Sequence, residues 1–112
     1  MIIKGQNMSA IEDFIDAVQG HHFVEAHEIL EHDWKDLKKA GSKDQANILK
    51  GLINGTTAIA LHVKGKKEQC TKIWSAFDKY KILLDTTEIE NKERYIFAKE
   101  LLEEKYEEVI NR

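Results

Sequence analysis

The sequence predicts an all-α protein, a compact bundle of about five helices. The chain of 112 residues has no proline and only six glycines, which favours long uninterrupted helices. Apolar residues recur at spacings of three and four, and no alternating run typical of a β-strand competes with them. With 42% hydrophobic and 33% charged residues, the composition suits one soluble domain that spans residues 1–112.

The first two helices are predicted from a cap and two glycines. Ser9 and Glu12 have the spacing of a capping box, so a short helix should begin at Ser9, with residues 1–8 loosely held. Gly20 can adopt the left-handed conformation that ends it. A second helix should run from about residue 23 to 40, before Gly41. The buried face of the first helix is expected to comprise Ile11, Phe14, Ile15 and Val18.

A third helix should begin at Ser42, whose spacing to Gln45 repeats the capping box, and should extend to residue 64 before Gly65. One of its faces is apolar, and the other carries Gly51 and Gly55. Each glycine inside a helix costs about 1 kcal/mol relative to alanine, so close packing should compensate. We expect this helix in the middle of the bundle, with the second helix lying in the groove along its small residues. That groove face is Gly51, Gly55, Ala58 and His62.

The rest of the chain predicts two more helices. Residues 66–85 carry an apolar stripe in which Cys70 is a small core residue rather than a nucleophile. Thr87 with Glu90 has the spacing of a third capping box, which would open a long last helix.

The composition of the chain disfavours several classes of binding partner. Seventeen basic against twenty acidic residues give a net charge of −3, which disfavours nucleic acid. A single cysteine excludes an intramolecular disulfide and favours the reducing cytosol. Because no apolar run approaches membrane-spanning length, and the first residues are too few and too polar for a secretion signal, we expect a cytoplasmic protein without a membrane partner. Self-association into a homo-oligomer is left open.

One stretch of the second predicted helix combines apolar and ionisable residues. Its core-facing stripe has spacings of four, three, four and three, and Glu31 lies at the edge of this stripe, one turn beyond a histidine. Burying a histidine or a glutamate alone is costly, so each needs a partner, a metal or a neutral protonation state. The stripe comprises Phe23, His27, Leu30, Trp34 and Leu37.

This stretch also carries a family resemblance. The pattern His27-x-x-x-Glu31-x-x-Trp34 is followed by Leu-Lys-Gly-Leu-Ile-Asn at residues 49–54 and Ala-Leu-His-Val-Lys-Gly at residues 60–65. Over roughly residues 10 to 85 the chain resembles the small helical bacterial and archaeal proteins known as domain of unknown function 309. The resemblance implies a suggested metal site on His27 and Glu31, with the family's later histidine matching His62.

The chain departs from the family pattern at two positions. Asn54 replaces the more usual glutamine, and Lys66 stands where an asparagine is expected. A role of these two side chains in holding a ligand is therefore not carried over.

A divalent metal at this motif has a physical basis. Side chains four residues apart on a helix lie side by side, so His27 and Glu31 could share one ion and His62 could complete three ligands. Water at the fourth position would then suit a metal-dependent hydrolase. Glu28 points about 100° away from His27 and is a weaker candidate ligand. The mixed nitrogen and oxygen set suits zinc, iron, manganese or nickel alike.

The competing hypothesis makes the same residues structural. A buried imidazole that donates to a buried carboxylate satisfies both groups, and Trp34 would pack over them. The protein would then be a non-catalytic binding or assembly module. The sequence leaves both hypotheses open, together with the identity of any small-molecule ligand.

Overall fold

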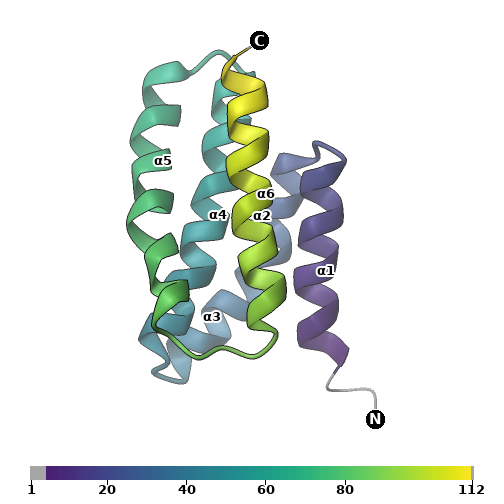
Figure 1. The fold of residues 1–112 in the computed structure, drawn as a ribbon, viewed down its shortest axis with the longest axis vertical. Helices are drawn as coiled ribbons and strands as arrows, with labels where there is room; N and C mark the ends of the chain where they lie inside the picture. The colour runs from purple at the N-terminus through teal and green to yellow at the C-terminus, as the bar shows by residue number, and fades with distance from the viewer. Residues whose placement is uncertain (1–4, 112) are drawn as a thin grey trace.

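Helix α4 lies at the centre of the fold, with the other helices packed around it (Figure 1). The computed structural model describes residues 5–111, and within that range it is helical without strands, as predicted. Helices α2, α3, α5 and α6 contact α4, and α1 packs against α2 and α6. The elements are α1 (Gly5–Gln19), α2 (Phe23–Ile29), α3 (Glu31–Lys39), α4 (Lys43–Val63), α5 (Lys67–Lys81), the 3₁₀ helix η1 (Ile82–Asp85) and α6 (Lys92–Ile110).

The middle of α4 is buried on all sides, which confirms the predicted central helix. Its start and end fall within one residue of the prediction, but the capping box does not form. Ser42 precedes the helix without a side-chain cap hydrogen bond. The Gln45 side chain instead donates to the Glu88 carbonyl, at 2.7 Å. The buried residues of α4 are Ala46, Ile48, Leu49, Gly51, Leu52, Ile53, Gly55, Thr56, Ala58 and Ile59.

The groove along the small residues of α4 holds α5 and α6, so the prediction that the second helix lies there is wrong. A Cβ on Gly51 would lie 2.9 Å from the Cβ of Tyr80 on α5. A Cβ on Gly55 would lie 3.1 Å from a ring carbon of Phe77 and 3.0 Å from Leu102 on α6. The close packing of α5 and α6 on α4 leaves no room for a side chain at these two positions, which accounts for the glycines.

The second predicted helix is divided at Leu30 into α2 and α3. Leu30 is fully buried at the break, with φ −88° and ψ −8°. Neither proline nor glycine lies there, so the sequence carried no signal for it. Both pieces pack on α4, and α3 runs at an angle to α2 in Figure 1. Leu30 is therefore packed into the core at the point where the chain changes direction.

Helix α1 begins at Gly5, four residues before the predicted start. Ser9 therefore lies inside the helix and cannot be its N-cap. The predicted loose segment is helical over residues 5–8, and its residues 1–4 lie outside the described range. The residue with a left-handed conformation after α1 is His21, with φ 63°, and not Gly20. The predicted buried face is confirmed, and it comprises Ile11, Phe14, Ile15 and Val18.

The last two helices keep their predicted cores but not every boundary. Cys70 is buried in α5 as predicted, Phe77 is buried with it, and the chain continues from α5 into η1. The third capping box is wrong, because α6 begins only at Lys92, after Asn91 in a left-handed conformation with φ 64°. Within residues 5–111, no helix is both long and apolar enough to cross a membrane.

Candidate functional site

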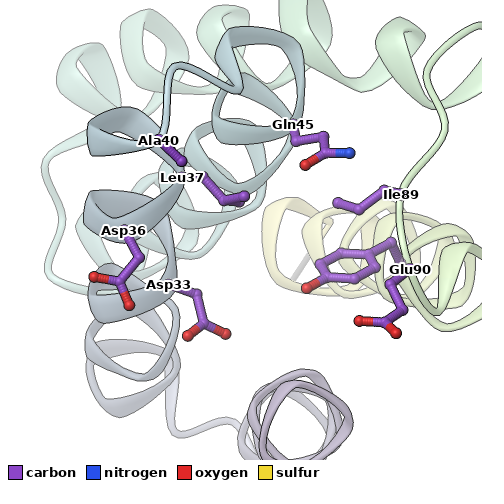
Figure 2. Close-up of a pocket in the computed structure, with 8 residues that line it drawn as sticks. Asp33, Asp36, Leu37, Ala40, Gln45, Ile89 and Glu90 are labelled. Carbon is purple, nitrogen blue, oxygen red and sulfur yellow. The ribbon is translucent and has the colours of Figure 1, made fainter. Parts of the chain in front are cut away.

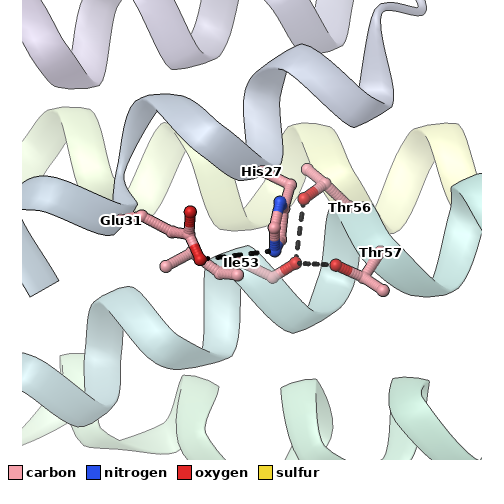
Figure 3. A network of polar contacts seen from close by, with 5 residues as sticks. All are labelled: His27, Glu31, Ile53, Thr56 and Thr57. Atoms are coloured by element: carbon pink, nitrogen blue, oxygen red, sulfur yellow. Dashed lines mark hydrogen bonds and ion pairs between the residues drawn. The ribbon is translucent and has the colours of Figure 1, made fainter.

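The His27 and Glu31 side chains lie side by side where α2 and α3 face α4 (Figure 3). His27 Nε2 and Glu31 Oε2 are 3.9 Å apart, and the two side chains are 35% and 39% exposed. This distance is too long for a hydrogen bond, and the contact is an ion pair when the imidazole is protonated. The pair is thus half-exposed, at the rim of the core and not inside it.

The α4 backbone beneath the pair is already hydrogen-bonded to side chains. The hydroxyls of Thr56 and Thr57 both donate to the Ile53 carbonyl, at 2.9 and 3.0 Å (Figure 3). Because both hydroxyl protons are donated within α4, neither is available to the His27–Glu31 pair.

His62 lies off the face of α4 that meets His27. The small pocket beside His27 is lined on α4 by Thr57, Ala60, Leu61 and Lys64. Because each residue of a helix turns by about 100°, His62 points away from this face. The three predicted ligands do not converge, and among residues 5–111 no group of three His, Cys, Asp or Glu side chains could hold a metal ion.

A separation of 3.9 Å still permits two donors on one ion, since zinc–nitrogen and zinc–oxygen bonds are each about 2.0–2.2 Å long. The described residues supply two protein ligands, where a zinc site uses three or four. Metal binding by the pair stays a prediction. Glu28 is exposed, and Phe23 is a core residue with 6% exposure.

Trp34, the third residue of the motif, lies in a different cleft. Its indole packs against the core and lines a cleft of about 460 Å³ between α3 and the start of α4. The Lys38 ammonium lies 4.5 Å from the centre of an indole ring, a cation–π contact. We call this space the lysine cleft, and its lining comprises Trp34, Lys38, Gly41, Lys43, Ala46, Asn47 and Lys50.

The lysine cleft is positive although the whole chain is negative. Lys38, Lys43 and Lys50 have no ion-pair partner among the described residues, and none of the lining residues is acidic. Sequence reasoning missed this cluster because its lysines come from two helices. The one local signal was the spacing of Lys43, Asn47 and Lys50, which places them on one face of α4.

A comparison with models of protein families assigns the chain to a family. The model of the domain of unknown function DUF309 matches residues 11–73, more than half of the sequence. The chain belongs to the DUF309 family. The predicted resemblance is confirmed, and the matched segment of this DUF309 chain holds both the His27–Glu31 pair and the lysine cleft. Neither a curated protein nor a solved structure matches the chain.

Proposed function

We propose that this DUF309 chain is a binding module for a small, multiply charged anion, and that the ligand occupies the lysine cleft. One observation carries the proposal: three lysines without ion-pair partners among the described residues line the same cleft as the Trp34 indole, and the Lys38 ammonium lies over that indole. The cleft volume of about 460 Å³ falls within the range of small-molecule sites.

Electrostatics favours an anion at this position. Like charges that line one cleft repel one another, and an anion relieves this repulsion. Lysine ammonium groups bind phosphoryl and carboxylate oxygens as point charges. The indole adds an apolar surface for the uncharged part of the ligand.

The His27–Glu31 pair supports the cleft in this proposal. The two residues lie on either side of the break at Leu30, one on α2 and the other on α3. Their contact therefore helps to hold the angle at which α3 presents Trp34. The competing sequence hypothesis also made the pair structural, but it expected a buried hydrogen bond beneath Trp34, whereas the two side chains are half-exposed and 3.9 Å apart.

The proposal is tested by titrating the protein with pyrophosphate and, separately, with citrate. The Trp34 indole N–H resonance, assigned with Trp34→Phe, should shift on binding. Lys43→Gln or Lys50→Gln should weaken binding about threefold to tenfold, since each removes one attractive charge. A stronger response to pyrophosphate than to citrate would identify a phosphorylated ligand.

Lys72→Gln is the matched control, because Lys72 is an exposed lysine of α5 outside the cleft. It should bind as the wild type does. An indole signal unchanged at millimolar anion, or equal weakening by Lys72→Gln and Lys43→Gln, would contradict the proposal.

A divalent metal on the His27–Glu31 pair is a second candidate, supported by their 3.9 Å separation. Two protein ligands would leave positions open for water, as a metal-dependent hydrolase requires. If the pair binds metal, elemental analysis of tag-free protein should show less metal in His27→Ala than in the wild type. His62→Ala should retain the wild-type content, and equal content in all three would remove this candidate.

A further inference from the structure

A second cleft lies on the other side of the α3–α4 turn from the lysine cleft, and it is acidic. It has a volume of about 410 Å³ and lies between α3, the segment before α6, and α6 itself. Asp33 from α3 and Glu90 from that segment face each other across the open space (Figure 2). We call it the tyrosine cleft; the lining residues used below are Asp33, Asp36, Leu37, Ala40, Ile89 and Tyr95.

Tyr95 supplies a hydrogen-bonding group that the fold does not use. Its side chain is only 5% exposed, and its hydroxyl has no hydrogen-bond partner among the described residues. No side-chain oxygen or nitrogen in the described residues is both sealed from solvent and unpartnered. The hydroxyl must therefore reach the cleft that Tyr95 lines. The hydroxyl is thus open to solvent at the cleft, where a ligand can replace water as its partner.

Asp33 supplies negative charge beside this hydroxyl. Burial raises the pKa of Asp33, with a further contribution from Asp36 that His32 opposes. Asp36 itself lies 3.3 Å from His32 and has that partner when the imidazole is protonated. Asp33 has no ion-pair partner among the described residues. Burial, together with the charges of Asp33 and Glu90, raises the pKa of Tyr95 to about 12, so the phenol stays neutral.

Three of the other lining side chains are apolar, and a hydrogen bond holds the segment before α6 against α4. Leu37, Ala40 and Ile89 line it beside the polar groups. The hydrogen bond from Gln45 to the Glu88 carbonyl fastens the segment before α6 to the start of α4. The cleft is thus formed before any ligand arrives, which lowers the entropic cost of binding.

We propose that the tyrosine cleft binds a small aliphatic amine. Its ammonium group donates to the Asp33 carboxylate and to the Tyr95 hydroxyl oxygen, and its methylene chain packs on Leu37, Ala40 and Ile89. An ammonium group has three donors and no acceptor, which complements a carboxylate and a phenolic oxygen. This site is independent of the lysine cleft, because the two clefts share no lining residue and have opposite charge.

Putrescine is the probe, added to the full chain and followed by calorimetry and by the backbone amide resonances of Asp33 and Tyr95. Both resonances should shift and saturate. Butanediol, which has the same chain length but no charge, should cause no saturable shift. Lysine blocked at its amino and carboxyl ends carries the same alkylammonium group as a peptide side chain. It should bind more weakly, and equal or tighter binding would contradict a free small amine as the ligand.

Asp33→Asn and Tyr95→Phe should each weaken putrescine binding about tenfold, because the first removes the negative charge that attracts the ammonium and the second removes the hydroxyl oxygen that accepts from it. Glu104→Gln, an exposed α6 position outside the cleft, removes one negative charge and should leave binding unchanged. Wild-type affinity in a folded Asp33→Asn, or equal weakening by Glu104→Gln, would overturn the proposal. If Tyr95→Phe does not fold, the putrescine affinity of Asp33→Asn tests the proposal by itself.

Discussion

At the residue scale, the contact between His27 and Glu31 is weak. Both side chains are more than one-third exposed, and their charged atoms are 3.9 Å apart. Exposed ion pairs at this helical spacing contribute about 0.3–0.5 kcal/mol. The pair therefore contributes little to the stability of the fold.

His27→Ala should lower the free energy of unfolding by less than about 1 kcal/mol, since it removes a half-exposed pair. Leu30→Ala, at the fully buried break, should cost about 2–5 kcal/mol. Urea denaturation of both variants and the wild type gives the comparison. A loss in His27→Ala as large as that in Leu30→Ala would show that the imidazole carries a buried contact.

Sequence reasoning placed His27 and Glu31 together because four residues make about one helical turn. It could not place His62, since that required the rotation of α4 about its own axis. The lysine cleft was missed for a similar reason. A lysine that faces a cleft and a lysine that faces bulk water look the same in a sequence, until the neighbouring helix is in place.

At the element scale, the two glycines of α4 set its distance from α5. Gly51→Ala should destabilise the fold by about 2 kcal/mol, although alanine is the better helix former by about 1 kcal/mol. The added methyl would lie 2.9 Å from the Cβ of Tyr80, which is bonded directly to the α5 backbone. The clash is thus relieved only by moving a helix, and thermal denaturation measures its cost.

Gly20→Ala is the control for this substitution. There the added methyl would lie 2.8 Å from a ring carbon of His22, an exposed side chain that can rotate away. Its effect on stability should stay within about 0.5 kcal/mol. If Gly51→Ala proved as mild as Gly20→Ala, the close approach of α4 and α5 would be wrong.

The capping boxes were the least reliable signals in the sequence. None of the three capping boxes forms. Ser9 lies inside α1, Gln45 bonds to the Glu88 carbonyl, and Thr87 precedes α6 by five residues. A capping box is a local hydrogen-bonding option, and tertiary partners or an earlier helix start competed with it successfully.

At the scale of the whole molecule, one contact joins α1 near the beginning of the chain to α6 near its end. Arg94 donates two hydrogen bonds to the Glu12 carboxylate, at 2.5 and 3.0 Å. These hydrogen bonds lower the pKa of Glu12, and partial burial opposes them. The contact links segments that lie 82 residues apart in the sequence.

Removing this link should make stability less dependent on pH. Because the pKa of Glu12 is lower in the folded state, its contribution is present above the ordinary glutamate pKa of about 4.3. It is lost as the pH falls through the lowered, folded-state value. Glu12→Gln should therefore be less stable than the wild type at neutral pH, and the two should converge in acid.

Urea midpoints measured from neutral to acidic pH test this convergence, with the exposed Glu104→Gln as the control. Glu104 makes no ion pair within the described residues, so its variant should follow the wild-type curve. A constant difference between Glu12→Gln and the wild type over the whole pH range would contradict the proposed ionic contribution.

The sequence by itself determined the helical class, the central position of α4, most of the buried faces and the family. These follow from local spacing, because the period of apolar residues fixes which side of a helix is buried. Only the tertiary structure decided where the second helix breaks, which helices fill the glycine groove, and which charged residues share a cleft. Those features depend on contacts between segments that are distant in the chain. The spacing of residues within one helix does not specify which other helix packs against it.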